Sequence, residues 1–236
     1  MTETIYRAAA LIVPLIIAIV FHEVAHGYVA RLRGDPTAAE RGRLTLNPLR
    51  HVDPVGTVVL PGALALSGLP VFGWAKPVPV IAARLKQPRT DMMLVAAAGP
   101  ATNLILAALG AAGLGVLLAA MTGAGGAITD PSGIARFAAL NLINFVTINV
   151  FLALFNLLPI PPFDGSHIVE GLLPARLARH YAKARQVGFV LVLVVLIALP
   201  ALIDGFDPVG TFVSPPVRWL TEHYFGLAGL IAGAPA

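Results

Sequence analysis

The sequence predicts an all-α protein that crosses the membrane several times, and three observations favour this class. Its 236 residues are 57% hydrophobic and only 12% charged, whereas a soluble domain usually carries about 25% charged residues. Several apolar stretches are long enough to cross about 30 Å of hydrocarbon as helices. Basic residues gather in the loops between these stretches, which is typical of membrane topology. The net charge of +4 is modest, so we expect no nucleic-acid partner.

Four clear transmembrane helices are expected. The first covers residues 8–30, the second residues 92–121 and the third residues 137–160, each with the roughly 20 apolar residues that a spanning helix needs. A fourth, shorter stretch at residues 187–203 precedes a mixed tail, in which residues 220–231 are expected to lie on the membrane. We predict one membrane-embedded domain over residues 1–236, with a core at about 8–170 and a C-terminal span and tail at 187–236.

Residues 54–80 differ from these spans. Prolines and glycines interrupt the apolar stretch 54–72, and a spanning helix seldom tolerates so many. We therefore predict a re-entrant segment there. Pro77 and Pro79 then force an extended backbone over residues 73–80, so the whole of 54–80 is expected to be re-entrant and partly β-like. The extended part could pair with another strand or with a bound peptide; the alternative is a plain linker with Trp74 at the membrane interface.

A polar pattern, His-Glu-x-x-His, lies near the end of the first span at His22, Glu23 and His26. Residues four apart share one helical face, so both imidazoles can reach one Zn²⁺ ion at about 2.0–2.1 Å. Glu23 lies beside that face, where a carboxylate can accept a proton from water. The chain has no cysteine, so a third metal ligand must be His, Asp or Glu. The pattern predicts a zinc site inside the membrane, where polar residues are costly and usually functional.

The best candidate for the third ligand is Asp164, which follows the prolines that end the third span. A lone aspartate in a loop of prolines and glycines is usually a turn residue. The missing ligand and the matching depth in the membrane favour metal binding here instead.

With these residues the sequence resembles the site-2 proteases, which are intramembrane zinc metalloproteases. The resemblance rests on His-Glu-x-x-His at 22–26 and on an Asn-x-x-Pro-x-x-Pro-x-Asp-Gly type of motif at 156–165. The segment 73–80 and the sequence Gly99-Pro100-x-x-Asn103 also resemble compact bacterial members that lack PDZ and CBS domains. The resemblance implies one Zn²⁺ per chain, held by His22, His26 and Asp164. It also implies Glu23 as the catalytic base and Asn156 as the residue that steadies the substrate carbonyl or its oxyanion.

The substrate implied is a transmembrane protein, cut within or near its membrane-spanning segment during regulated intramembrane proteolysis. Such a helix must unwind before hydrolysis, and the extended segment could hold the unwound strand by edge pairing. For Asn103, a substrate or water-path role and a role in joining helices are equally supported, whereas Asn149 is interpreted as a helix contact. The candidate substrate-binding residues are Trp74, Lys76, Pro77, Val78, Val80 and Asn103.

The basic loops at 31–53, 74–91 and 163–185 are expected on the cytoplasmic side. This places the N-terminus outside and the zinc site near the cytoplasmic face of the cell membrane. The lipid bilayer is then an obligatory partner, and a second copy of the chain is a further candidate.

Two other functions use the same residues. A metal or proton transporter could employ the histidines and carboxylates as a relay, although no internal repeat of the transporter type is visible. An inactive membrane scaffold could retain the motif, although a structural zinc site has no need of Glu23.

Overall fold

Helices are the only regular elements among the residues that the computed structural model describes, which are 2–66, 73–122, 133–183 and 185–233. Three helices are long and apolar enough to cross a membrane: α1 (Thr2–Leu32), α4 (Pro88–Met121) and α5 (Gly133–Asn156). A fourth crossing is formed if the bent helices between residues 175 and 202 count as one span. The prediction of an all-α, multi-pass membrane protein is confirmed.

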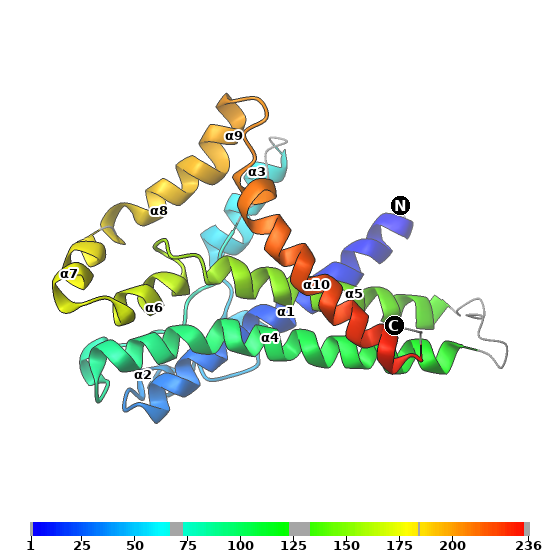
Figure 1. The fold of residues 1–236 in the computed structure, drawn as a ribbon, viewed down its shortest axis with the longest axis horizontal. Helices are drawn as coiled ribbons and strands as arrows, with labels where there is room; N and C mark the ends of the chain where they lie inside the picture. Colours follow the sequence, from blue (N-terminus) through cyan, green and yellow to red (C-terminus); the bar gives the residue numbers. More distant parts are fainter. Residues whose placement is uncertain (1, 67–72, 123–132, 184, 234–236) are drawn as a thin grey trace.

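The helices α1, α4 and α5 form the body of the molecule, and each packs against the other two (Figure 1). Small residues make this close packing feasible, as is usual between helices in lipid. Ala107 and Ala111 on α4 are fully buried. A Cβ atom at Gly110 would lie 2.8 Å from the Phe145 ring, so a glycine is needed where α4 meets α5.

Pro14 explains a polar contact between α1 and α5. A proline nitrogen cannot donate to the carbonyl four residues earlier, which leaves the Ala10 carbonyl without its helical partner. Asn144 on α5 donates its side-chain amide to this carbonyl at 2.9 Å. Backbone groups freed at membrane depth need such partners inside the protein, and this one joins the two helices.

The C-terminal helix packs against the body. Residues 220–231, expected on the membrane, lie in α10 (Ser214–Ile231), which packs against α4 and α5. Tyr224 donates its hydroxyl to the Leu104 carbonyl at 3.0 Å. A Cβ atom at Gly115 would lie 2.6 Å from the Ala228 carbonyl oxygen. Small residues on both helices let α10 approach α4 closely, and the contact of residues 220–231 with the membrane surface stays a prediction.

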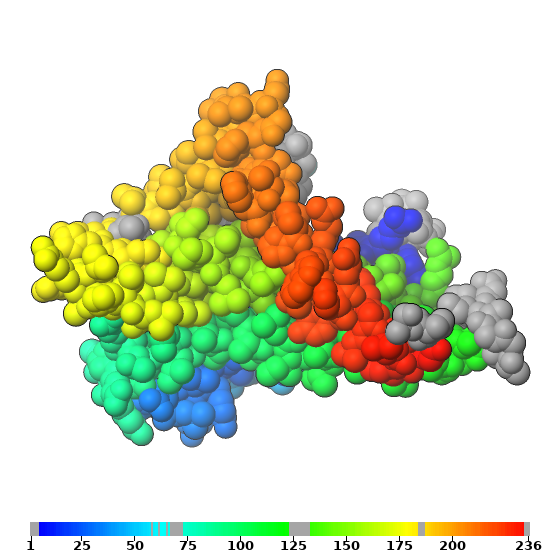
Figure 2. Space-filling model, viewed as in Figure 1, coloured from blue at the N-terminus to red at the C-terminus, as the bar shows by residue number. Residues whose placement is uncertain are grey.

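Four consecutive helical segments project from this body and are called the arm below (Figures 1 and 2). Residues 175–183 and 187–202 meet at a bend of 56°. The second of these stretches covers the predicted fourth span, 187–203, except for its last residue. The arm consists of α7 (Ala175–Lys183), α8 (Arg185–Leu193), η4 (Val194–Ala198) and α9 (Leu199–Leu202).

Residues 54–66 are helical, as η2 (Pro54–Val59) followed by α3 (Leu60–Leu66). The Asp53 side chain starts this helix, because its Oδ1 accepts hydrogen bonds from Val55 N–H and Gly56 N–H. The rest of the predicted re-entrant segment, 67–72, lies outside the described residues. Residues 73–81 belong to no helix or sheet, and Ile81 at their end has an extended backbone (φ −106°, ψ 100°); residues 73–81 are called the extended segment below. The remaining short elements are α2 (Thr37–Glu40), η1 (Pro48–Arg50), η3 (Ala82–Arg84), α6 (Asp164–Leu172) and η5 (Val209–Val213).

Candidate active site

His22 and His26 lie one turn apart on the same face of α1. Their Nε2 atoms are 3.0 Å apart, and the two rings meet edge to face with a centroid separation of 4.6 Å. Both side chains are buried between α1 and α4, with residue exposures of 7% and 9%. The i, i+4 spacing in the sequence thus brings two ring nitrogens to one point.

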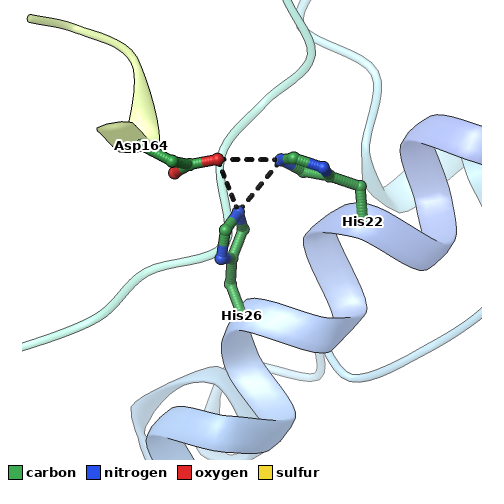
Figure 3. A group of neighbouring side chains, drawn as sticks. All are labelled: His22, His26 and Asp164. Atoms are coloured by element: carbon green, nitrogen blue, oxygen red, sulfur yellow. Dashed lines mark hydrogen bonds and ion pairs between the residues drawn. The ribbon is translucent and has the colours of Figure 1, made fainter. Parts of the chain in front are cut away.

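The helix α6 brings Asp164, its first residue, to the same point (Figure 3). Asp164 Oδ2 lies 3.2 Å from His22 Nε2 and 3.4 Å from His26 Nε2. The loop that leaves α5 turns back tightly before α6. Gly165 makes this turn feasible, because a Cβ atom there would collide with the Leu157 carbonyl. Two elements far apart in the sequence therefore supply three ligand atoms.

Hydrogen bonds on the far side of each ring show that these three atoms suit a metal ion. His26 Nδ1 donates to the Val95 carbonyl at 2.7 Å, and His22 Nδ1 donates to Asn103 Oδ1 at 2.6 Å. In a neutral imidazole, the other ring nitrogen, Nε2, then carries the lone pair. Asp164 Oδ2 is buried and has no hydrogen-bond donor. Three electron-pair donors within 4.8 Å of one another repel unless a cation lies between them, and two imidazoles with one carboxylate are a common zinc ligand set.

Glu23 lies beside the three ligand atoms and contacts the extended segment. Its Oε2 accepts a hydrogen bond from Val78 N–H at 2.7 Å. The Val78 side chain packs against α1, where a Cβ atom at Gly27 would lie 2.7 Å from it. The carboxylate after the first histidine is thus held by the backbone of the segment that the sequence predicted to be extended.

The extended segment is fixed along one edge by the rest of the chain. Trp74 N–H donates to the Gly56 carbonyl at 3.0 Å, and Lys76 N–H donates to the His51 carbonyl at 2.9 Å. Arg43 donates to the Lys76 carbonyl at 2.7 Å. Together with Val78, every second residue from 74 to 78 is bonded on this side. Pro77 and Pro79 have no N–H, so Ala75 alone offers a backbone donor on the opposite edge between residues 75 and 79.

The sequence pattern of Peptidase family M50 matches residues 10–199, which include both histidines, the extended segment and Asp164. The chain belongs to peptidase family M50. This is the site-2 protease family, and membership makes the chain a membrane-embedded zinc metalloprotease.

Curated M50 relatives cover most of the chain. "Putative zinc metalloprotease YwhC" of Bacillus subtilis is 37% identical over 207 residues, which are 88% of this chain and 84% of the relative. "Putative zinc metalloprotease Rip2" of Mycolicibacterium smegmatis is 33% identical over 190 residues, or 79% of this chain and 66% of the relative. The protein of the same name in Mycobacterium tuberculosis is 32% identical over 216 residues, or 91% and 72%. No solved structure matches the chain.

Asn156 forms no hydrogen bond with His22, His26 or Asp164 in the part of the chain that the structure describes. Asn156 is the last residue of α5, and its amide donates to the Leu152 carbonyl of its own helix at 2.9 Å. Its oxyanion role stays a prediction. Asn103 is fully buried, and its amide faces His22, Ala18 and Asn149 rather than the extended segment.

The remaining candidates of the extended segment differ in their surroundings. Trp74 meets Phe189 of α8 edge to face, with ring centroids 5.4 Å apart. Lys76 and Pro77 are exposed, whereas Val78 is buried. Val80 packs against a small apolar cluster that includes Ala30 and Val95. Their contact with a substrate stays a prediction.

Several supporting residues were missed by the sequence reasoning. Gly99 lies directly behind the site, since a Cβ atom there would be 2.5 Å from His26 Nε2 and 2.6 Å from His22 Nε2. The motif Gly99-Pro100-x-x-Asn103 was the available signal, because its glycine and asparagine share one helical face. No pattern identified Arg43 as a support of the extended segment.

Asp35 is a second support without a sequence signal. It is fully buried after α1 and binds the end of the extended segment, where Oδ2 accepts from Ile81 N–H at 2.5 Å. Oδ1 accepts from the Thr37 hydroxyl and from Thr37 N–H. Burial by itself would raise the pKa of Asp35, but the hydrogen bonds from Thr37 and Ile81 outweigh it and lower the pKa.

Proposed function

We propose that this M50 protein is an intramembrane zinc endopeptidase that hydrolyses peptide bonds within or near the transmembrane segments of other membrane proteins, as in regulated intramembrane proteolysis. The observation that carries the proposal is the convergence of His22 Nε2, His26 Nε2 and Asp164 Oδ2 beside Glu23. These groups lie on or against a helix that is long and apolar enough to span the membrane. The peptide bonds within reach would therefore be those of membrane-embedded segments.

We assign His22, His26 and Asp164 as the ligands of one Zn²⁺ ion. When bound, zinc supplies a positive charge that acidifies a water molecule and stabilises negative charge on the peptide oxygen. Three protein ligands leave one position open, as catalytic zinc sites require. The donor set fits zinc because both ring nitrogens present lone pairs and the carboxylate oxygen has no other partner.

Glu23 would act as the proton carrier. It accepts a proton from the attacking water, whose oxygen forms a bond to the scissile carbonyl carbon. It then returns the proton to the leaving nitrogen, and the C–N bond breaks to give an acid and an amine. The hydrogen bond from Val78 N–H holds one oxygen of the carboxylate, which orients the group and leaves the other oxygen for the proton.

Asn156 would stabilise the developing oxyanion. Its amide has a second N–H beyond the one that binds the Leu152 carbonyl. A donor at this place would supplement the metal, and removing one such donor typically costs about 10²–10³ in rate. The contact requires a substrate carbonyl between Asn156 and the three ligand atoms.

The extended segment would receive the unwound substrate on its opposite edge. The Pro77 carbonyl already accepts a long hydrogen bond of 3.4 Å from Arg43, and Pro79 has a carbonyl but no N–H, so this edge would offer mainly acceptors, which suit the N–H groups that an unwound helix exposes. Ala75→Pro removes the one backbone N–H that this edge offers between residues 75 and 79 and leaves the Val78–Glu23 bond in place, so it should reduce cleavage without changing zinc content. Ala75→Ser, which keeps the N–H, is the control, and equal cleavage by the two variants would contradict strand pairing.

The basic loops support an active site near the cytoplasmic face with the N-terminus outside. The absence of cysteine in the sequence allows a direct test with single-cysteine variants at Gln87 and Thr122, at opposite ends of α4. A membrane-impermeant thiol reagent added to intact cells should label the variant at 122 and spare the variant at 87. The reverse labelling would contradict this orientation.

The decisive experiment compares purified wild type with Glu23→Gln on a test substrate that has one membrane-spanning helix. We expect equal zinc content in both proteins and cleavage by the wild type alone. Cleavage by Glu23→Gln would contradict the assigned base. Metal or proton flux in proteoliposomes without proteolysis would favour a transporter instead.

A further inference from the structure

We infer that Asn103 of α4 and Asn149 of α5 are positioning residues that fix the orientation of the His22 ring and thereby set the affinity of the site for zinc. This inference rests on the proposed function, because it takes His22 as a metal ligand. The two asparagines are called the asparagine relay below. Neither asparagine belongs to the motifs at 22–26 and 156–165.

The hydrogen bonds of the asparagine relay have only one consistent direction. Asn149 donates its amide to the Phe145 carbonyl at 2.8 Å, which turns its Oδ1 toward α4. Asn103 donates its amide to this Oδ1 at 2.8 Å and to the Ala18 carbonyl at 3.2 Å. Backbone carbonyls can only accept, so neither amide can be flipped without placing two acceptors against each other.

The direction of these bonds determines the state of His22. With both amide hydrogens of Asn103 in use, its Oδ1 must face the ring, 2.6 Å from His22 Nδ1. Nδ1 therefore donates, and in the neutral ring that binds a metal the lone pair is on Nε2. Asn103 and Asn149 are both fully buried, so no water competes for these bonds. A contact of this kind orients a metal-binding histidine, and its loss typically lowers metal affinity by about 10–100-fold.

A simple role in joining helices does not account for the arrangement. Asn144 shows what such a role requires, because its amide binds the Ala10 carbonyl of α1 and no ionisable side chain. Asn149 lies on the same helix, but its Oδ1 is directed through Asn103 to the ring of His22. Substitution of Asn144 is thus a matched control for the loss of a polar helix contact.

The two histidines are held differently, and this difference sharpens the test. His26 Nδ1 binds the backbone carbonyl of Val95, which no side-chain substitution removes. His22 Nδ1 binds a side chain. Loss of the asparagine relay should therefore release one ligand ring and leave the other in place, so zinc binding weakens without being abolished.

The test measures zinc dissociation constants by competition with a chelator, using the purified full-length protein and its variants Asn103→Leu, Asn149→Leu and Asn144→Leu. We expect zinc affinity to fall by about 10–100-fold in Asn103→Leu, by a smaller factor in Asn149→Leu, and by less than about twofold in Asn144→Leu. The absorption spectrum of bound Co²⁺ should change in the first two variants only, because the ring orientation of a ligand has changed.

The double variant Asn103→Leu/Asn149→Leu shows whether the two asparagines act together through His22 or independently of each other. If both residues act through the same ring, adding Asn149→Leu to Asn103→Leu should cause almost no further loss of zinc affinity. If Asn103→Leu fails to fold, the zinc affinities of Asn149→Leu and Asn144→Leu still test the inference. Equal zinc affinity in these two variants, or additive effects in the double variant, would overturn the inference. Zinc binding by the wild type without peptide cleavage would refute the endopeptidase function and leave the inference about affinity standing.

Discussion

The body and the arm of this protein differ in what they bury, although both expose apolar side chains, such as Leu109 at 61% on α4 and Val190 at 60% in the arm. In the body, polar side chains such as Asp91, Asn103 and Asn149 are fully buried. In the arm, apolar side chains such as Val190 and Leu202 are 60% and 79% exposed, and the arm projects from the rest of the molecule (Figure 2). In lipid, apolar packing has little hydrophobic driving force, so polar contacts and close approach of small residues determine which helices meet.

This contrast predicts where substitutions matter. The site lies where buried polar groups and glycines join α1, α4 and α6, so changes there should alter metal binding. The arm touches the site region through Phe189 on Trp74 and through the Tyr181 hydroxyl, which donates to the Pro159 carbonyl at 2.6 Å. These contacts do not involve His22, His26 or Asp164, so changes in the arm should alter catalysis without altering metal binding. The substitutions below separate the two regions.

The largest effect is expected for Asp164→Ala. It removes one of three ligand atoms, so zinc affinity should fall by more than the roughly 10–100-fold that loss of a supporting contact causes, and cleavage should be lost. Zinc per purified chain and cleavage of a membrane-spanning substrate measure the two effects. His180→Ala, at an exposed histidine of the arm, should bind zinc as the wild type does; zinc loss in both variants would show that the site lies elsewhere.

A smaller loss of zinc affinity, by about tenfold, is expected for Gly99→Ala. The added Cβ atom would lie 2.5–2.6 Å from ring atoms of His22 and His26, so both rings must move away from their present positions, and displaced ligand geometry weakens a metal site. Gly113→Ala on the same helix is the control, because its Cβ atom would make only ordinary contacts at 3.5 Å. Equal zinc affinity in both variants would mean that α4 does not support the histidines.

The sequence was sufficient to predict the main helices of the body and the cluster at the site. Helical periodicity places His22 and His26 on one face, and membrane depth selects Asp164 from the other carboxylates. These inferences need only local geometry and the thickness of the bilayer. The structure brings these three residues together without any change to the predicted set.

The residues that support the site could not be predicted from local geometry and membrane depth. The partner of His22 on α4 is Asn103, 81 residues further along the chain. This pairing depends on how α1 and α4 are rotated against each other, which hydropathy does not specify. The bonds of Val78 N–H to Glu23 and of Ile81 N–H to Asp35 involve backbone donors, which every residue but proline has. The placement of α10 depends on small residues such as Gly115 of α4. The sequence does not indicate which helix packs against such residues.

In the arm, Gly188→Ala should lower cleavage by several-fold while zinc affinity stays within about twofold. A Cβ atom at Gly188 would lie 2.5 Å from the Pro161 carbonyl oxygen, so α8 or the loop before Asp164 must shift. A shift of this size at the edge of a site disturbs substrate orientation more than ligand chemistry. Gly226→Ala is the control, because nothing lies within 4 Å of its added Cβ atom. Zinc loss in Gly188→Ala would show that the arm is part of the metal site.

The smallest effect concerns stability and depends on pH. Asp35 has a lowered pKa in the folded protein, so its ionised form stabilises the fold at pH values above its unfolded pKa of about 3.9, and this contribution is lost as the pH falls through the lower, folded pKa. Asp35→Ala should therefore lower the free energy of unfolding by about 1–2 kcal/mol near pH 7, and the difference from the wild type should shrink toward pH 3. Melting temperatures of the detergent-purified proteins at several pH values measure it, with exposed Asp204 replaced by alanine as the control. A difference that stays constant from pH 7 to pH 3 would show that the charge of Asp35 does not hold the extended segment to α1, and that its burial alone accounts for its effect.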